Sequence, residues 1–399
     1  MATPPKRKAS SGRKSTGMNR DDLKRKAVLV FRGVVVCLVL LAGLYALGNT
    51  KLFSQVYNSN NSVAGLSTTS PAIPVVAPVL NTVLYDEKMI QLANYPTSTI
   101  KTVSTSTRPV ATSSKAVATS SVPTVHHLWP VKTAYPNVGA LLPFNRIVAY
   151  YGNFYSKGMG VLGQYPEPQM IGMLNAEVSK WQLADPSTPV IPAIDYIAVT
   201  AQGSAGADGK YRLRMPDSQI DHALELAKEV NGIVILDVQV GLSTLQTELP
   251  LLEKYLKMSN VHLAIDPEFS MKDGVRPGRE IGTFDSADIN YAANYLAGLV
   301  RQNGLTPKIL VIHRFTEDMV TGYKKIAPLP EVQIVMDMDG WGFPAKKINT
   351  YNSVIYPEPV QFTGFKLFYK NDILPPSTRM LTPAEILKLK PRPSFIQYQ

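Results

Sequence analysis

Residues 233–269 read IVILDVQVG (233–241), LSTLQTELPLLEKYLKMSN (242–260) and VHLAIDPEF (261–269), two apolar runs on either side of a helical pattern at 244–258. Each run is short, rich in Val, Ile and Leu, and ends on polar residues. Apolar runs of this length are typical of strands buried on both faces, and a helix between two such strands makes them a parallel pair. The stretch therefore predicts one β-α-β unit of a parallel sheet.

The same alternation continues through residues 144–399. Strand-like runs lie at 146–152, 189–201, 233–241, 261–269, 308–315, 332–340, 364–370 and 394–399. Helical patterns lie at 168–184, 217–231, 244–258, 285–303, 316–326, 344–353 and 382–389. Eight repeats in a segment of this size predict a (β/α)8 TIM barrel, for which about 250 residues is typical. An open doubly wound sheet is the alternative, and no cofactor is predicted.

The composition is that of a folded chain, with 45% of the 399 residues hydrophobic and 18% charged. The single cysteine, Cys37, excludes a disulfide scaffold and a zinc site built on thiolates. The formal net charge of +11 is concentrated at the N-terminus, where residues 1–32 hold ten Lys/Arg against two Asp. Residues 144–399 hold 25 Lys/Arg and 26 Asp/Glu, so no nucleic-acid partner is predicted.

One apolar stretch, AVLVFRGVVVCLVLLAGLYALG at 27–48, is long enough to cross a bilayer as a helix. Residues 1–26 form a basic tail, which the positive-inside rule keeps in the cytoplasm. The pattern predicts a transmembrane signal anchor that holds the chain in the plasma membrane in a single pass, with its C-terminal domain extracytoplasmic. A cleaved signal peptide, with the small residues Ala46 and Gly48 after the apolar run, and a lipoprotein signal at Cys37 are the alternatives.

Residues 49–143 are rich in Ser, Thr, Pro, Val and Ala and show no hydrophobic period. This composition predicts an extended, mostly disordered stalk, because such a segment has few large side chains to bury. A short helix is predicted within it at 84–94 (LYDEKMIQLAN). The predicted order is therefore tail, anchor, stalk and one barrel domain at 144–399.

Polar residues that close apolar strands are the candidates for a site, because (β/α)8 barrels carry their active sites at the carboxyl ends of the strands. The candidates for substrate contact are Tyr151, Asp237, Gln239, His313, Asp337, Asp339, Trp341 and Tyr369. The aromatic residues in this set are suited to stacking on sugar rings. Packing at the rim, hydrogen bonds between neighbouring strands and turn formation are the structural alternatives.

Asp266 and Glu268 are the candidate catalytic pair. Residues two apart on a strand share a face and lie about 6.6 Å apart along it, so both carboxyls are expected at the barrel mouth. Where solvation is poor, two such groups cannot both ionise freely, and the pKa of one rises. A protonated carboxyl beside an ionised one is the arrangement that cleaves glycosidic bonds. The structural alternative is an ion pair with Arg276 or Arg279 in the following loop.

Other hydrolytic chemistries lack their residues in this sequence. His222 falls within a predicted helix and His262 at the start of a strand, which leaves His313 as the one histidine beside the acids, so no metal site is predicted. A serine hydrolase would need a GxSxG turn, and the domain has none.

Residues 264–268 (AIDPE) resemble the DxDxE signature of chitinase-like family 18 glycoside hydrolases, which closes the fourth strand of a (β/α)8 barrel. The resemblance implies that Glu268 is the general acid of a retaining or substrate-assisted reaction, with Asp266 orienting the N-acetyl group of the substrate. Residues 150–153 (YYGN) and 336–339 (MDMD) resemble the YYGxW and MxYD segments of the same family.

Two residues depart from that family pattern. Ala264 stands at the first Asp of the signature, and Met338 stands at the Tyr of MxYD. The second departure removes a hydroxyl that helps to hold the N-acetyl group, which puts substrate-assisted cleavage in doubt.

A second resemblance covers most of residues 145–399. The runs that carry it are GVLGQ (160–164), LDVQVG (236–241), LAIDPEF (263–269), VRPGREIG (275–282), KILVIHRF (308–315) and GFKLFYKND (364–372). They are similar to a family of uncharacterised bacterial cell-envelope (β/α)8 proteins, mostly actinobacterial and lipoprotein-like, which supplies no established activity. The expected function is a membrane-anchored, glycoside-hydrolase-like barrel that acts on an envelope or extracellular glycan. The alternative is a non-catalytic surface barrel that binds a glycan or a protein.

Overall fold

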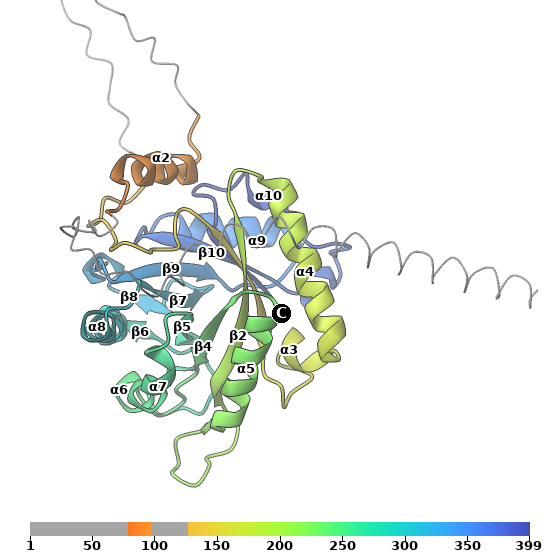
Figure 1. The fold of residues 1–399 in the computed structure, drawn as a ribbon. Helices are drawn as coiled ribbons and strands as arrows, with labels where there is room; N and C mark the ends of the chain where they lie inside the picture. The colour runs from red at the N-terminus through yellow and green to blue at the C-terminus, as the bar shows by residue number, and fades with distance from the viewer. Residues whose placement is uncertain (1–78, 97–126) are drawn as a thin grey trace, which may run out of the picture. The chain divides into compact units, whose positions relative to one another are not determined.

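The computed structural model describes residues 79–96 and 127–399. Eight parallel strands, one from each predicted run, close into a barrel (Figure 1). In chain order these are β1 (Arg146–Gly152), β2 (Val190–Ala201), β4 (Ile233–Val238), β5 (Val261–Ile265), β7 (Lys308–Arg314), β9 (Val332–Met338), β10 (Phe362–Leu367) and β11 (Phe395–Tyr398). Consecutive barrel strands are neighbours, and β1 closes the ring by pairing with both β2 and β11. The predicted (β/α)8 TIM barrel is confirmed.

Helices cover the outside of the barrel (Figure 1). They are α3 (Val161–Gln164), α4 (Glu167–Ala184), α5 (Asp217–Glu229), α6 (Leu245–Glu248), α7 (Glu253–Leu256), α8 (Ser286–Asn303), α9 (Pro344–Thr350) and α10 (Pro383–Ile386). The α8 helix begins with a reciprocal capping box made by Asp285 and Asp288. The α8 helix ends at Gly304, which adopts the left-handed conformation.

Two predicted helices differ from the structure. The one at 244–258 is divided into α6, a 3-10 turn at Leu249–Leu252 and α7, because Pro250 supplies no N–H for a continuous helix. The one at 316–326 is wrong. That segment contains a short strand, β8 (Val320–Thr321), and a 3-10 turn at Tyr323–Lys325.

Two further short strands were not predicted. β8 pairs with β6 (Phe284–Asp285) in a separate two-stranded sheet. β3 (Arg212–Arg214) pairs antiparallel with the end of β2 and extends the barrel sheet on the carboxyl side of that strand.

The alternation of side chains along each strand produces two cores. Outward side chains, such as Val148, Leu236 and Ile312, pack against the helices. Inward side chains from the first half of each strand fill the interior of the barrel. They are Ile147, Ala149, Ala193, Ile233, Ile235, Ala264, Ile309, Val311, Val335, Phe362 and Phe395. The amino-terminal half of the interior is therefore solid and apolar, and any site must use the inward positions beyond it.

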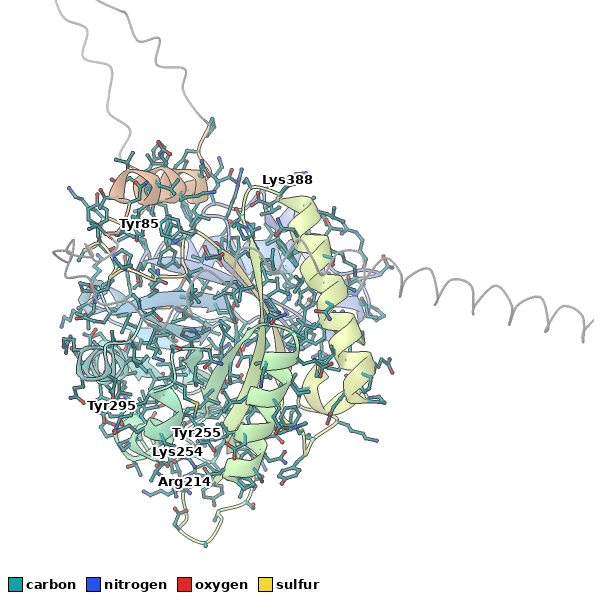
Figure 2. The ribbon with its side chains drawn as sticks, in the orientation of Figure 1. Tyr85, Arg214, Lys254, Tyr255, Tyr295 and Lys388 are labelled. Atoms are coloured by element: carbon teal, nitrogen blue, oxygen red, sulfur yellow. The ribbon has the colours of Figure 1, made fainter. Side chains whose placement is uncertain are left out.

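Part of the predicted stalk is folded against the barrel. The predicted short helix is present as α2 (Thr82–Ala93), which buries Tyr85, Met89 and Ala93 at four-residue spacing. Tyr85, labelled in Figure 2, and Met89 join the interior apolar core, as does Leu142. Since Asn94 also donates to the carbonyl of Leu389 at 2.9 Å, the described residues before β1 extend the barrel's packing rather than forming a free spacer.

No helix among the described residues is long and apolar enough to cross a membrane. The predicted tail at 1–26 and anchor at 27–48 lie outside the described residues. The parts of the predicted stalk at 49–78 and 97–126 lie outside them as well.

Candidate active site

A ring of polar side chains lies above the apolar core of the barrel. Each strand, or the residue directly after it, contributes one at the next inward position beyond its apolar inward residues, and on β10 the inward Gly364 lies between Phe362 and Lys366. The eight are Tyr151, Asp195, Asp237, Asp266, His313, Asp337, Lys366 and Gln397, and all are buried. Hydrogen bonds cross the interior between strands that are not neighbours, such as 2.6 Å from Gln397 Nε2 to Asp195 Oδ2. Burial of so many ionisable groups requires that they neutralise one another or stay uncharged.

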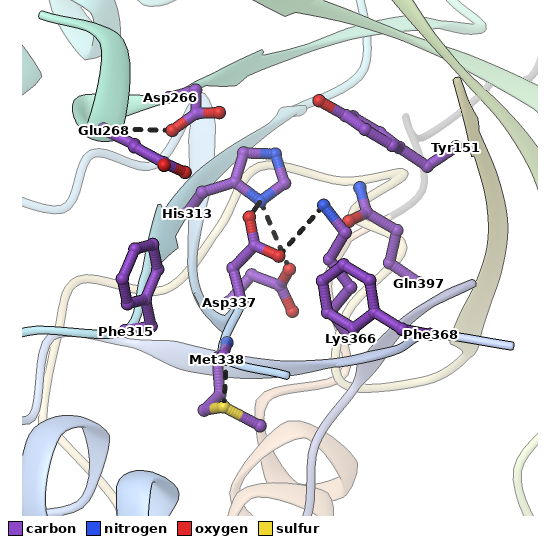
Figure 3. A network of polar contacts seen from close by, with 12 residues as sticks. Tyr151, Asp266, Glu268, His313, Phe315, Asp337, Met338, Lys366, Phe368 and Gln397 are labelled. Carbon is purple, nitrogen blue, oxygen red and sulfur yellow. Dashed lines mark hydrogen bonds and ion pairs between the residues drawn. The ribbon is translucent and has the colours of Figure 1, made fainter. Parts of the chain in front are cut away.

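His313 is the cation at the centre of the ring (Figure 3). Its Nε2 lies 2.8 Å from Asp237 Oδ2, and its Nδ1 lies 3.4 Å from Asp337 Oδ2 and 3.3 Å from Asp339 Oδ2. Burial by itself lowers the pKa of His313, but the contacts with Asp237 and Asp337 and the charge of Asp339 outweigh it and raise the pKa well above its usual value. The imidazole is therefore charged at neutral pH and holds three strands together through their carboxylates.

Lys366 is the second buried cation. Its Nζ lies 2.9 Å from Asp339 Oδ1 and 3.9 Å from the centroid of the Tyr151 ring. Burial lowers the pKa of Lys366, but the nearby carboxylates, Asp339 first, raise it above its usual value overall. Tyr151 is fixed from its other end, because Gln239 Nε2 donates to its hydroxyl at 3.1 Å. The site thus contains two buried ion pairs, His313 with Asp237 and Lys366 with Asp339, and the Tyr151 ring packs against Lys366.

Gly364 makes room for one of these carboxylates. A Cβ at this position would lie 2.4 Å from Asp337 Oδ1 and 3.0 Å from the Phe395 ring. Because residue 364 has no side chain, the Asp337 carboxylate can lie against the backbone of the neighbouring strand β10.

Glu268 reaches the site through a turn rather than along a strand. β5 ends at Ile265, and Asp266 then caps a 3-10 turn at Pro267–Phe269, its Oδ1 accepting from the Glu268 N–H at 3.0 Å (Figure 3). The backbone of Gly282 packs on this turn, donating to the Glu268 carbonyl at 2.7 Å. Asp266 and Glu268 therefore line the same cavity, as predicted. The capped turn brings them together, whereas the prediction assumed that both lie on one strand.

The ring opens into a cavity of about 510 Å³, within the size range of ligand pockets. Five of the predicted site residues besides Trp341 line it. These are Tyr151, Gln239, Asp266, Glu268 and Asp339. Aromatic side chains line much of the remainder: Phe269, Phe315, Trp341 and Phe368. Asp237, His313 and Asp337 do not line the cavity, because they form the buried layer on which its acidic wall rests.

The carboxyls of this site hold their protons unusually tightly. Burial, with the charge of Asp339 in addition, raises the pKa of Glu268 to about 7, although Lys366 and His313 oppose the shift. Burial also raises the pKa of Asp266 well above its usual value, and it raises the pKa of Asp195 to about 8. Near neutral pH Glu268 is therefore partly protonated, beside the Lys366–Asp339 ion pair.

Tyr369 lies outside both the polar ring and the cavity. Tyr369 follows the outward-facing Leu367, and its hydroxyl contacts the Tyr150 hydroxyl at 2.8 Å and donates to Glu177 Oε1 of α4 at 3.0 Å. It packs between the barrel and α4 and does not line the cavity. Met338 likewise packs in the outer core, and position 338 therefore does not face the cavity where the family resemblance would place a hydroxyl.

Arg276 and Arg279 do not cover the acidic pair. Both side chains are exposed, and within the part of the chain that the structure describes neither forms an ion pair with Asp266 or Glu268. Across residues 79–96 and 127–399, no group of three or more His, Cys, Asp or Glu side chains is arranged to hold a metal ion.

No protein-family model and no curated protein matches the chain. Among solved structures, the cellulase Cel5C_n matches with a TM-score of 0.33 and 12% identity over 55% of this chain and 65% of that chain. A ruminal GH26 endo-beta-1,4-mannanase matches with a TM-score of 0.30 and 11% identity over 64% of this chain and 58% of that chain. A Burkholderia cenocepacia dihydropteroate synthase complexed with 7,8-dihydropteroate matches with a TM-score of 0.28 and 8% identity over 64% of this chain and 86% of that chain. The chain thus spans 65% and 58% of the first two proteins, and similarities of this size carry no argument about activity.

Proposed function

We propose that the barrel cleaves a glycan of the cell envelope or the extracellular space, with Glu268 as the general acid. The placement of Glu268 carries this proposal. Its partly buried carboxyl lines an open cavity, and its pKa of about 7 keeps a proton available near neutral pH. Protonation of the leaving oxygen is the step that glycosidic cleavage requires of such a group.

Asp266 and Asp339 are the carboxyls that would complete the reaction. Both line the same cavity as Glu268. Asp339 forms an ion pair with Lys366 and is suited to stabilise the positive charge that develops on the sugar ring. Asp266 uses Oδ1 to hold the Glu268 N–H, which leaves Oδ2 for the substrate. The roles of acid and charge stabiliser therefore fall on groups in different electrostatic surroundings.

The cavity walls support a sugar rather than a small polar substrate. Phe315, Phe368 and Trp341 line it, and the Trp341 side chain is 50% exposed. Aromatic faces in a cavity wall can stack on a flat apolar face, and a pyranose ring presents such a face.

The test is to incubate the full chain in detergent micelles with peptidoglycan and chitin fragments and to analyse the products by mass spectrometry. The proposal expects new reducing ends that increase with time. Tight binding without new ends would favour the non-catalytic glycan-binding barrel, and the absence of both would contradict a glycan function.

We also propose that the apolar stretch at 27–48 anchors the chain and holds the barrel outside the plasma membrane. The basic tail at 1–26 supports this orientation. Cell fractionation tests it: the full chain should enter solution only with detergent, whereas a chain without residues 1–48 should not need it. A full chain recovered in the aqueous fraction would contradict the anchor.

A further inference from the structure

An aromatic side chain and a cation lie together at the mouth of the cavity, and neither takes part in the proposed proton transfer. Trp341 and Lys346 both line the cavity, and Lys346 Nζ lies 4.8 Å from the centroid of the Trp341 ring. Trp341 follows β9, and Lys346 lies in α9, so one short segment presents both side chains. The arrangement offers a flat apolar face and a positive charge to the same ligand.

The backbone of this segment holds the two side chains in place. Gly342 has a φ of +143°, and a Cβ there would lie 2.7 Å from Lys346 Cδ. A residue with a side chain would be strained at this φ, and its Cβ would displace the lysine stem. The Gly342 N–H donates to Asp372 Oδ1 at 2.9 Å, and the buried Lys347 holds the other oxygen of Asp372 at 2.7 Å. The position of Lys346 over the indole is therefore a built feature of the loop.

The charges of the cavity leave Lys346 uncompensated. The charged residues that line it are Asp266, Glu268, Asp339, Lys346 and Lys366. Lys366 and Asp339 neutralise each other at 2.9 Å, and burial keeps Asp266 protonated by raising its pKa. Glu268, with a pKa of about 7, carries only part of a negative charge at neutral pH. Throughout the described ranges no carboxylate forms an ion pair with Lys346, which leaves its ammonium exposed at the entrance.

We propose that Trp341 and Lys346 form a subsite for a sugar that carries a carboxylate. The indole stacks on the pyranose ring, and the Lys346 ammonium pairs with the carboxylate that projects from it. This inference rests on the proposed function and specifies its substrate class, an acidic rather than a neutral glycan. Because the pair is solvent-exposed, its effect is a moderate selectivity of about threefold in affinity.

Binding to the full-length Glu268→Gln variant tests the inference without turnover. Three probes are titrated: peptide-free strands of alternating N-acetylglucosamine and N-acetylmuramic acid, the same strands with the lactyl carboxylate methyl-esterified, and chitotetraose. The free acid should bind about threefold more tightly than its ester, and added salt should remove that difference.

Two further variants assign the preference to its residues. Lys346→Met should abolish the difference between acid and ester, whereas Trp341→Ala should weaken all three probes. Lys324→Met is the matched control, since Lys324 also lies over an aromatic ring, that of Tyr323 at 5.8 Å, but does not line the cavity. Equal binding of acid and ester, or a preference that survives Lys346→Met, overturns the inference while glycan binding stands. No binding of any probe overturns the proposed function together with it.

Discussion

Replacing Glu268 with Gln is expected to lower kcat for glycan cleavage by about 10²–10⁴-fold. Glutamine keeps the size of the side chain and one carbonyl oxygen, but it cannot deliver a proton to a leaving oxygen. The partly buried carboxyl is not needed to hold the turn, because the Asp266 side chain caps it through the backbone N–H of residue 268. The loss should therefore appear in kcat, with little change in the affinity for an uncleaved glycan.

The measurement compares kcat and KM for the glycan fragments that the wild-type chain cleaves. Glu280→Gln is the control, since Glu280 is an exposed carboxyl in the loop after the same strand and does not line the cavity. It should cleave at the wild-type rate. Wild-type turnover in Glu268→Gln would remove Glu268 from the mechanism.

Replacing Asp237 with Ala is expected to lower the free energy of unfolding by roughly 3–5 kcal/mol. Asp237 is fully buried and accepts from His313 Nε2 at 2.8 Å. Its removal leaves a buried imidazolium with only the longer contacts to Asp337 and Asp339, at 3.4 and 3.3 Å. The cost is that of an incompletely compensated charge in the interior of the barrel, where water cannot replace the lost carboxylate.

Urea denaturation of the two proteins at pH 6 measures this difference. The surroundings of His313 raise its pKa in the folded state above the usual 6.5, so its stabilisation is complete below about pH 6.5 and is lost as the pH rises through the folded pKa. The difference in the free energy of unfolding between wild type and Asp237→Ala should therefore be larger at pH 6 than at pH 9. Asp217→Ala, which removes an exposed partner of Lys254, should change the stability little. A loss below about 1 kcal/mol in Asp237→Ala would contradict the role of the buried network.

Much of the barrel and its acidic ring follows from one regularity of the sequence. Each predicted run is apolar and then closes on a polar residue, and in a parallel barrel the inward alternation carries that residue to the same end of the interior. This argument brings Asp237, His313 and Asp337 to one end of the interior, although they belong to strands that are far apart in the chain, but they form a buried layer and do not line the cavity as the predicted substrate contacts would.

The same alternation, applied strictly, also identifies residues that the sequence analysis placed wrongly or passed over. Lys366 and Tyr369 are three residues apart and cannot share a face of one strand, so only one of them can enter the cavity. The structure buries Lys366 in the cavity wall and Tyr369 against α4. Similarly, Tyr85 and Met89 lie one helical turn apart, which is a packing signal that the polar composition around them concealed.

Other features depend on contacts that no local pattern specifies. The helix expected at 316–326 is replaced by short elements, because β8 pairs with β6 and Gly322 adopts a φ of +69°. The raised pKa of Glu268 arises from burial and from the charge of Asp339, against the opposing charges of Lys366 and His313, and these three residues come from different strands or loops. Long-range geometry of this kind becomes visible only when the barrel is closed.

Direct titration of Glu268 tests the central claim, that this carboxyl keeps its proton near neutral pH. The full chain is labelled with ¹³C at glutamate carboxyls, and the Glu268 resonance is assigned by its absence in Glu268→Gln. The account predicts a midpoint at about pH 7, so that the acid is present below that pH and lost as the pH rises through it. A midpoint near the ordinary value of 4.5 would show an ionised carboxylate at neutral pH and would contradict the assignment of Glu268 as a proton donor.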